Sequence, residues 1–394
     1  MSKSKLLDVI RLTGITWDHS RGLTPMVATA QRHKELNPEV EISWVKRSLQ
    51  DFADKPLSRL AEDFDLIVID HPWVGFVAAH QVLVPLDRHL PASYLEDQAS
   101  HSVGASHQSY TYGGHQWALA IDAATPVASS RPDLLHRLQL PLPQSFEEVL
   151  ELAAGGGVIF PAIPIDTLMN FYMFCIALGE EPFKSGKEVV GMEVGIQALQ
   201  MMRELAERVD PDCFHMNPIR VYEAMTTTDR YAYCPFAYGY TNYARRGYAE
   251  KTLQFHDLVS MGETGNLRST LGGTGIAVSA RCQQVEAAVK YAAFVASPQC
   301  QRTLFFDNGG QPGHRSAWKD QLNNSLTANF FSNTLPALDR AFLRPRYDGY
   351  MHFQDNGGIP IRNYMMEGGP EEKVLQDLNA LYTSVKPYLT ELIP

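Results

Sequence analysis

The sequence has no apolar run of about 18 residues, the length that a membrane-spanning helix requires. It also has no excess of basic residues, because 34 Lys and Arg stand against 44 Asp and Glu and give a formal net charge of -10. Nucleic-acid binding depends on concentrated positive charge. We therefore expect no transmembrane segment and no nucleic-acid partner.

Cysteine is scarce, and the sequence contains no CxxC pair. An odd number of widely spaced cysteines indicates reduced, mostly buried thiols, which slightly favours the cytoplasm. The N-terminal segment starts with basic residues, but its short apolar run is broken by Asp8 and Arg11, unlike a secretory leader. We expect a periplasmic protein if a leader was removed upstream of Met1, and otherwise a cytoplasmic one. The five cysteines are Cys175, Cys213, Cys234, Cys282 and Cys300.

The common catalytic fingerprints are also missing, including GxSxG, HExxH and the dinucleotide and kinase motifs. The glycine-rich segment 271–275, LGGTG, opens a strand instead of a helix and lacks the Lys-Ser/Thr of a P-loop. Its glycines instead let the backbone closely approach either a ligand or another lobe of the protein. No cofactor is expected.

The chain of 394 residues is too long for one ordinary core and predicts two domains. Its first part alternates strand and helix patterns, which is typical of βαβ units in a parallel sheet. The third strand, DLIVID, is continuously apolar and is expected to be buried on both faces. The predicted order is strand 6–15, helix 25–36, strand 40–45, helix 49–60 and strand 65–70.

The later part of the chain mixes hairpin, helix and strand signals. A Gly113-Gly114 turn separates two aromatic segments, and Ser145 followed by Glu147 and Glu148 predicts a helix cap. The segment 344–358 is interpreted as a long aromatic and polar loop. The other expected elements are helices 166–178, 191–208 and 285–297, and strands 231–240 and 271–280.

Four segments together resemble the sugar-binding branch of ABC-transporter solute-binding proteins, the family 1 extracellular binding proteins related to maltose-binding protein. Segment 112–135 is similar to the family's hairpin followed by Asp-x-x-Thr-Pro and a helix, and 142–153 to its next helix cap. Segment 271–301 is similar to its Gly-Gly strand and a helix ending in Ser-Pro-x-x-Gln. Segment 309–318 is similar to its Gly-rich turn.

The resemblance implies an α/β fold of the two-lobed periplasmic-binding-protein type (type II), in which each lobe is a mixed sheet flanked by helices. It places a ligand cleft between the lobes. The N-terminal lobe is expected to comprise residues 1–122 and about 271–315, and the C-terminal lobe about 123–270 and 316–394. The implied function is binding of a sugar, sugar acid or polyol for an ABC-type uptake system, with permease subunits as partners and a monomeric chain.

Two Asp-His pairs are the sharpest candidate site residues. They follow the first and third strands, and ligands in parallel sheets bind beyond the carboxyl ends of strands. Carboxylates accept hydrogen bonds from neighbouring hydroxyls, and tryptophan stacks on a sugar ring. The alternative is that each Asp caps the following helix or turn. The expected contacts of this group are Trp17, Asp18, His19, Asp70, His71, Trp73 and Asp122.

Metal binding and acid-base catalysis are two other interpretations of these pairs. Adjacent loop residues rarely point at one ion, and no HxH or HxxxH spacing occurs, so no metal is expected. Acid-base catalysis by His19, His71 and Asp70 is the alternative function, in which a cytoplasmic enzyme on the same scaffold acts on a small hydroxylated metabolite. An intracellular ligand sensor is a third option.

The remaining expected contacts lie further along the chain. Tyr238 and Tyr240 follow a strand of the second lobe, where a tyrosine stacks on carbohydrate or simply packs in a sheet. Asn170 lies near the start of a helix, whose N-H groups favour polar ligands. The other candidates are Gly273, Thr274, His314 and Arg315.

Overall fold

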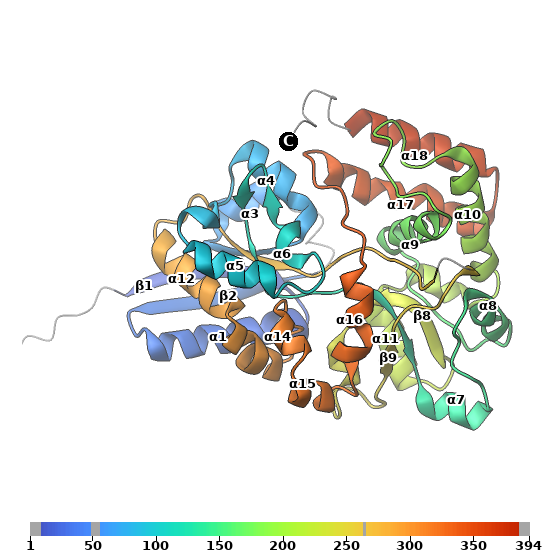
Figure 1. Cartoon of the computed structure of the whole chain (residues 1–394), viewed down its shortest axis with the longest axis horizontal. Coiled ribbons are helices and arrows are strands. Elements are labelled where there is room, and N and C mark those ends of the chain that lie inside the picture. Colours follow the sequence, from blue (N-terminus) through green and yellow to red (C-terminus); the bar gives the residue numbers. More distant parts are fainter. Residues whose placement is uncertain (1–8, 49–55, 263–264, 386–394) are drawn as a thin grey trace, which may run out of the picture. The chain divides into compact units, whose positions relative to one another are not determined.

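A computed structural model of the 394-residue chain describes residues 9–48, 56–262 and 265–385. The chain forms two compact units (Figure 1). Unit 1 comprises Met1–Ala123 and Gly273–Asp320, and unit 2 comprises Ala124–Gly272 and Gln321–Pro394. The chain therefore passes from one unit to the other three times.

Unit 1 is built on a five-stranded sheet in the order β2-β1-β3-β10-β6. β1 runs parallel to β2 and β3, whereas β10 runs antiparallel to β3 and β6, so the sheet is mixed. Its strands are β1 (Ile10–Trp17), β2 (Val40–Arg47), β3 (Leu66–Ile69), β6 (Leu119–Ala120) and β10 (Gly275–Val278), with the hairpin β4 (Thr111–Tyr112) and β5 (His115–Gln116). Its α-helices are α1 (Ser20–Leu36), α3 (Leu57–Asp63), α4 (Val74–His80), α5 (Ala92–Ser100), α6 (Ser106–Ser109), α12 (Val285–Ala296), α13 (Pro298–Cys300) and α14 (Arg315–Trp318). Shorter turns are the 3-10 helices η1 (His71–Trp73) and η2 (Leu86–Arg88), and the π-helix η6 (Gln301–Phe305).

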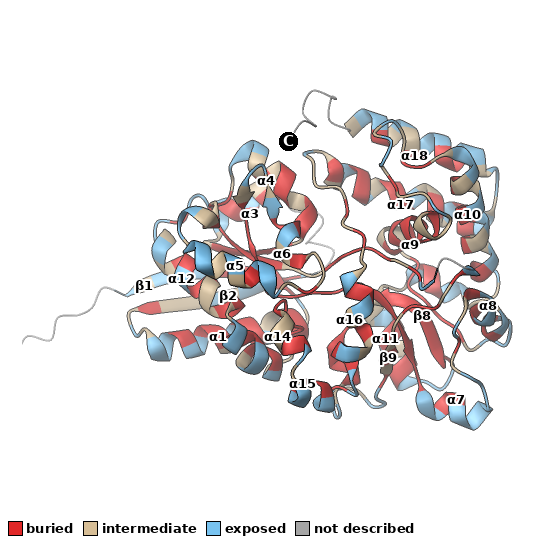
Figure 2. Cartoon of the chain, viewed as in Figure 1, coloured by how far each residue is buried: buried red, intermediate tan, exposed pale blue. Residues whose placement is uncertain are grey.

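The third strand of the unit 1 sheet is buried on both faces, as its apolar sequence predicted. Along β3, Leu66 and Val68 join the core beneath α1 and α12, and Ile67 and Ile69 join the core beneath α3 and α4. The four residues are 0 to 1% exposed, whereas helices around the sheet, such as α1, carry exposed residues that are pale blue in Figure 2. Alternate side chains of a strand point to opposite faces, so this single strand contributes to two cores.

The N-terminal predictions agree with the structure where it describes the chain. The strand expected at 6–15 is β1, which continues through Gly14 to Trp17 and stays paired with β2 over its whole length. Gly14 fits within the strand because a Cβ there would lie 2.7 Å from the Trp44 ring. Residues 1–8 lie outside the described residues. The helix expected at 49–60 begins within the undescribed residues 49–55, and α3 occupies its described end.

Unit 2 is built on the three-stranded antiparallel sheet β8-β7-β9, extended by a parallel bridge between Val158 and Tyr233. Its strands are β7 (Pro126–Ser130), β8 (Tyr233–Tyr238) and β9 (Gln254–His256). Its α-helices are α7 (Pro132–Leu138), α8 (Phe146–Ala154), α9 (Pro164–Ala177), α10 (Met192–Ala206), α11 (Pro218–Thr227), α15 (Gln321–Leu326), α16 (Phe330–Asp339), α17 (Tyr350–Glu367) and α18 (Glu371–Val385). Two 3-10 helices, η3 (Pro211–His215) and η4 (Thr241–Ala244), complete it.

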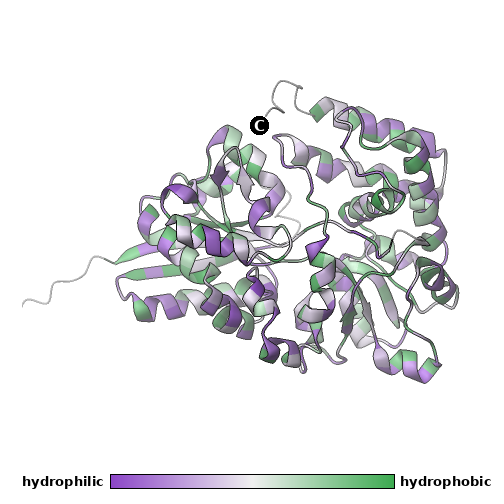
Figure 3. Ribbon diagram, viewed as in Figure 1, coloured by the Kyte–Doolittle hydropathy of each residue, from purple (hydrophilic) through white to green (hydrophobic). Residues whose placement is uncertain are grey.

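The helices of unit 2 divide into a central and a covering group. Every residue of α9 from Asp166 to Cys175 is buried, whereas α10 and α18 mix hydrophilic and hydrophobic residues (Figure 3). α9 packs against α10 and α17. The predicted cap of α8 is confirmed, because the Ser145 side chain accepts a hydrogen bond from the backbone N-H of Glu148 at 3.3 Å.

The prediction of a long loop at 344–358 is wrong from Tyr350 onward, where α17 begins. Gly357, Gly358 and Pro360 resemble helix breakers in the sequence. In the structure, a Cβ at Gly358 would lie 1.7 Å from the carbonyl oxygen of Pro164, so this glycine lets α17 lie directly against the start of α9. Tertiary packing overrides the local propensity here.

The five cysteines are free and buried, as their scattered spacing predicted. Within residues 9–48, 56–262 and 265–385, the helices are too short or too polar to span a bilayer.

Candidate functional site

The sheet of unit 1 gathers polar residues at one edge. β1 and β3 are parallel, so the residues that follow Trp17 and Ile69 lie at the same edge. β10 enters the sheet at that edge, because Gly275 pairs with both Ile69 and Ala120. We call the polar residues at this edge the strand-end cluster: Asp18, His19, Asp70, His71, Asp122 and Thr274.

An ion pair between Arg21 and Asp122 joins the two sides of the strand-end cluster. Arg21 donates from Nε and Nη2 to the two carboxylate oxygens at 2.7 and 2.5 Å, and both side chains are at most 4% exposed. The two residues are 101 positions apart. Asp122 was expected from the sequence as a ligand contact, whereas Arg21 was not. The sequence did contain a signal for Arg21. A cation in the first turn of a helix interacts unfavourably with the helix dipole, and an anionic partner compensates for this.

In the first Asp-His pair, the histidine caps the following helix, whereas the capping alternative expected the aspartate to do so. His19 caps α1, because its Nδ1 accepts a hydrogen bond from the Arg21 backbone N-H at 3.0 Å. Asp18 is exposed and pairs with Lys46 at 2.8 Å. Burial, helped by the Arg21 charge, lowers the pKa of His19 to about 4. His19 is therefore a weak base at neutral pH, which does not favour the enzymatic alternative.

The second Asp-His pair lies deeper. Asp70 accepts a hydrogen bond from the His71 backbone N-H at 2.8 Å and caps the 3-10 helix η1, as the capping alternative expected. The Asp70 side chain is 26% exposed, whereas that of His71 is 1% exposed. The His71 ring meets the edge of the Tyr110 ring with centroids 6.3 Å apart. Asp70 is thus the more accessible member of this pair.

The two expected tryptophan stackers differ in accessibility. Trp17 is 6% exposed and covers Gly22 so closely that a Cβ there would lie 2.4 Å from its ring. Trp73 is partly exposed and packs edge-on against Phe76, with centroids 5.6 Å apart. In unit 1, Trp73 offers the more accessible aromatic surface.

Gly273 and Thr274 lead into β10 at the same edge. Gly273 has φ +95°, and a Cβ there would lie 2.3 Å from the Asp122 carbonyl oxygen, so a side chain is excluded. The Thr274 carbonyl accepts hydrogen bonds from the backbone N-H groups of Ile121 and Asp122, each at 3.1 Å. Its hydroxyl oxygen is buried, and no group in the described part of the chain hydrogen-bonds to it.

His314 and Arg315 lie at the start of α14, shortly after Pro312, whose backbone forms a bridge with Asp122. The His314 ring is 2% exposed and faces Asp97, and Arg315 donates from Nε to the Ser102 carbonyl at 2.7 Å. These two candidates therefore contact the end of α5 and the residues that follow it.

Unit 2 contains the other three candidates. Tyr238 ends β8, lies at 2.8 Å from the Thr270 hydroxyl and covers Gly272 with its ring. Tyr240 is 9% exposed and lies near Tyr222, with ring centroids 6.2 Å apart. Asn170, on α9, is 3% exposed, and its Nδ2 has no hydrogen-bond partner within the described residues.

A buried acid on α9 was not found from the sequence. Asp166 lies one helical turn before Asn170 and is 5% exposed. Burial raises the pKa of Asp166 to about 8. Asp is common in the first turn of helices, where it is usually exposed, so the sequence offered no signal for this residue.

A depression of about 430 Å³ on unit 2 contains none of these candidates. It is lined by residues of α10, of the end of α17 and of the start of α18. Its polar groups already pair with each other: Arg203 contacts Glu207 at 2.9 Å, and Tyr364 donates to Glu371 at 2.8 Å. We do not assign a ligand to it.

Comparisons with known proteins identify the family. The model of the bacterial extracellular solute-binding protein family matches residues 28–320. No curated protein matches the sequence. Similar solved structures include the maltose-bound MalE3 of T. maritima, at 17% identity and a TM-score of 0.83 over 95% of this chain and 100% of that one.

Two further structures extend the comparison. A solute-binding protein of Agrobacterium radiobacter K84 in complex with ribitol shares 17% identity, with a TM-score of 0.79 over 96% of this chain and 99% of that one. A solute-binding protein of Thermotoga lettingae bound to α-D-tagatose shares 16% identity, with a TM-score of 0.78 over 94% and 99%. These matches establish the fold predicted from the sequence. Because the family model covers well over half of its residues, the chain belongs to the bacterial extracellular solute-binding proteins.

Proposed function

We propose that this solute-binding protein takes up a sugar or polyol and presents it to the permease of an ABC-type uptake system. Maltose, ribitol and tagatose, named with the three similar structures, are all small molecules rich in hydroxyl groups. Hydroxyl groups donate and accept hydrogen bonds, which suits a set of carboxylates, amides and hydroxyls.

The observation that carries the ligand class is a pair of buried polar atoms without partners in the described part of the chain: Thr274 Oγ1 in unit 1 and Asn170 Nδ2 in unit 2. An unsatisfied buried polar group costs about 1 to 3 kcal/mol. A ligand hydroxyl supplies the missing hydrogen bond at each atom. Both residues were selected from the sequence.

Aromatic and acidic side chains support the same ligand class. Trp73 and Tyr238 are partly exposed, and an aromatic face stacks on the apolar face of a sugar ring. Asp70 is partly exposed at the strand-end cluster, where its carboxylate can accept from ligand hydroxyls. The interlobe cleft, the remaining site residues and the monomeric state stay predictions.

We further propose that the protein works outside the cytoplasm, as its family's description states. The slight preference for the cytoplasm rested on the free thiols, and it finds no support in the family. Burial raises the pKa of the thiols, to about 12 for Cys213 and Cys300 and about 11 for Cys282. Buried thiols of high pKa react poorly, so free cysteines are compatible with an oxidising compartment.

Isothermal titration calorimetry with maltose, ribitol and tagatose tests the ligand class. A ligand found in this way should bind about tenfold more weakly to Thr274→Val, which removes one hydrogen bond at nearly constant volume. Thr303→Val is the matched control, because the Thr303 hydroxyl is exposed and bonds within its own helical turn. A folded wild-type protein that binds no sugar, sugar acid or polyol would contradict the proposed class.

Asn170→Leu extends the test to unit 2. It removes the amide while keeping a buried side chain of similar size, so we expect weaker ligand binding with an unchanged far-UV circular dichroism spectrum. Full affinity in both variants would remove Thr274 and Asn170 from the site.

A further inference from the structure

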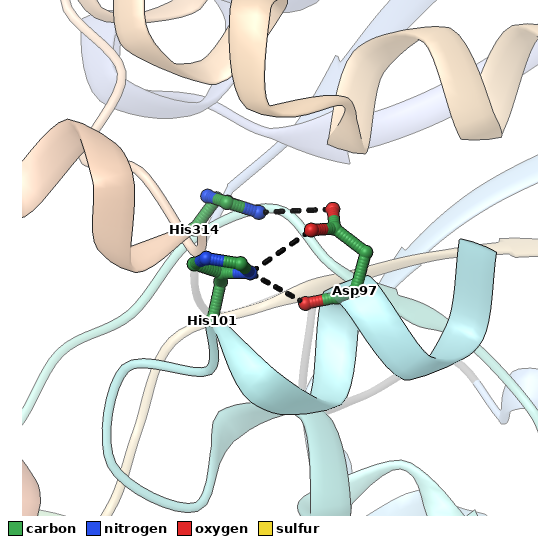
Figure 4. Close-up of side chains that lie close together, drawn as sticks. All are labelled: Asp97, His101 and His314. Carbon is green, nitrogen blue, oxygen red and sulfur yellow. Dashed lines mark hydrogen bonds and ion pairs between the residues drawn. The ribbon is translucent and has the colours of Figure 1, made fainter. Parts of the chain in front are cut away.

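Unit 1 brings two histidines and one aspartate together at the end of α5 (Figure 4). Asp97 lies on α5, and His101 caps its C-terminal end one turn later. His314 caps the start of α14. A backbone bridge between Ser102 and His314, and a 2.7 Å hydrogen bond from the Arg315 N-H to the His101 carbonyl, hold the two segments side by side.

The three side chains converge on one point. His101 Nδ1 lies 2.9 Å from Asp97 Oδ1, and His314 Nε2 lies 3.4 Å from Asp97 Oδ2. The imidazole rings stack with centroids 5.0 Å apart and an interplanar angle of 16°. One donor atom from each residue lies within 4.8 Å of the other two. A tetrahedral zinc ion with bonds of about 2.1 Å separates its ligands by roughly 3.4 Å, so small side-chain rotations suffice.

We propose that Asp97, His101 and His314 bind a divalent transition-metal ion, with Zn²⁺ as the best fit and solvent completing the coordination. Two imidazoles and one carboxylate are a common donor set for zinc. Hard cations such as Ca²⁺ and Mg²⁺ prefer all-oxygen sites. The two imidazoles therefore select against them.

The surroundings of His314 suit a metal ligand. Its Nδ1 lies 2.8 Å from the Ser316 hydroxyl oxygen, and its Nε2 faces Asp97. Nδ1 also accepts a hydrogen bond from the Ser316 backbone N-H at 3.3 Å. These contacts at Nδ1 fix the orientation of the ring and leave Nε2, directed at Asp97, as the nitrogen that would meet the ion.

One of the three proposed ligands is buried, and the other two are accessible to solvent. The His314 side chain is 2% exposed and is fixed by its neighbours, whereas the side chains of His101 and Asp97 are 48% and 39% exposed. An ion can enter from solvent without unfolding the unit. Once bound, it would tie α5 to a segment more than 200 positions away, and so stabilise unit 1.

A second His-Asp pair in unit 1 provides the matched control. His115 Nδ1 lies 2.9 Å from Asp87 Oδ2, the same separation as in the pair of His101 and Asp97. Among the described residues, no third metal ligand joins His115 and Asp87. His115→Ala therefore removes a histidine with the same kind of partner but leaves the proposed site complete.

The test is calorimetric titration of the chelator-treated full chain with ZnCl₂. We expect one equivalent of Zn²⁺ to bind and to raise the melting temperature. Binding should be at least tenfold weaker in His101→Ala and Asp97→Asn, and unchanged in His115→Ala. Co²⁺ should give the visible absorption of a tetrahedral site in the wild type, but not in His101→Ala. CaCl₂ and MgCl₂ should not bind.

Three results would overturn the proposal: no stoichiometric Zn²⁺ binding, equal affinity in His101→Ala and wild type, or equal losses in His101→Ala and His115→Ala, which would mark unspecific uptake by surface histidines. His101 is half exposed, so its replacement leaves the fold intact. Sugar binding measured in chelator is independent of this result, and the failure of one proposal does not affect the other.

Discussion

Asp166 makes the stability of unit 2 depend on pH in a way that a single substitution should remove. The side chain is 5% exposed on α9, and its Oδ2 has no hydrogen-bond partner in the described part of the chain. Burial raises its pKa from 3.8 to about 8. Between these two values, the folded chain holds a proton that the unfolded chain has released. The contribution of Asp166 to stability is therefore complete below about pH 4 and is lost as the pH rises towards 8.

The size of the effect follows from the gap between the two pKa values. Each pH unit between 3.8 and about 8 changes the free energy of unfolding by about 1.4 kcal/mol. Above pH 8, the ionised carboxyl of Asp166 therefore reduces stability by on the order of 6 kcal/mol relative to a neutral group of the same shape. Asp166→Asn supplies such a group, so this variant should be more stable than the wild type at pH 8.5 and about as stable at pH 4.

Urea unfolding followed by circular dichroism at pH 5, 7 and 8.5 measures this difference. Tryptophan fluorescence is unsuitable, because all five tryptophans lie in unit 1 and Asp166 lies in unit 2. Asp212→Asn, at an exposed position of unit 2, controls for the loss of one negative charge. The reasoning would be refuted if Asp166→Asn and the wild type lost stability in parallel as the pH rises.

Two further substitutions test other features of the structure. Arg21→Met leaves the Asp122 carboxylate buried without its partner, so it should reduce the free energy of unfolding by about 3 to 5 kcal/mol. Urea unfolding measures this loss. A loss below about 1 kcal/mol would show that the ion pair is not formed in solution. Gly358→Ala introduces a Cβ at 1.7 Å from the Pro164 carbonyl oxygen, whereas Gly357→Ala meets side-chain atoms of Phe353 and Leu168 at 3.2 to 3.4 Å. Gly358→Ala should therefore lower the melting temperature more than Gly357→Ala, and the reverse order would contradict the close approach of α17 to α9.

Local patterns in the sequence predicted much of the fold. The continuous apolar run at 65–70 is β3, and the helix predicted at 285–297 is α12, which ends before Pro298 as expected. These elements are set by burial of their own residues and by local stop signals. The helix that replaced the expected loop after Tyr350 depends instead on close contact with α9, which no local pattern encodes.

The residues of the candidate site also divide into those that local sequence patterns predict and those that depend on distant contacts. Strand ends can be found from a sequence, and this placed Asp18 and Asp70 at one edge of the sheet of unit 1. Partners distant in the chain cannot be found in this way, and so Arg21 and the cluster around His314 were missed. The choice among buried polar residues also depends on rotamers, which the sequence does not give.

Unit 1 consists of two chain segments that are far apart in the sequence, and this affects how the protein can fold. β10 lies between β3 and β6 in the sheet of unit 1, yet β6 ends at Ala120 and β10 begins at Gly275. A growing chain that has not reached Gly275 exposes two unpaired strand edges and the apolar faces that α12 later covers. Such species aggregate readily. Neither unit can be expressed as a contiguous fragment, and folding of the first sheet must wait for a strand made long after its neighbours.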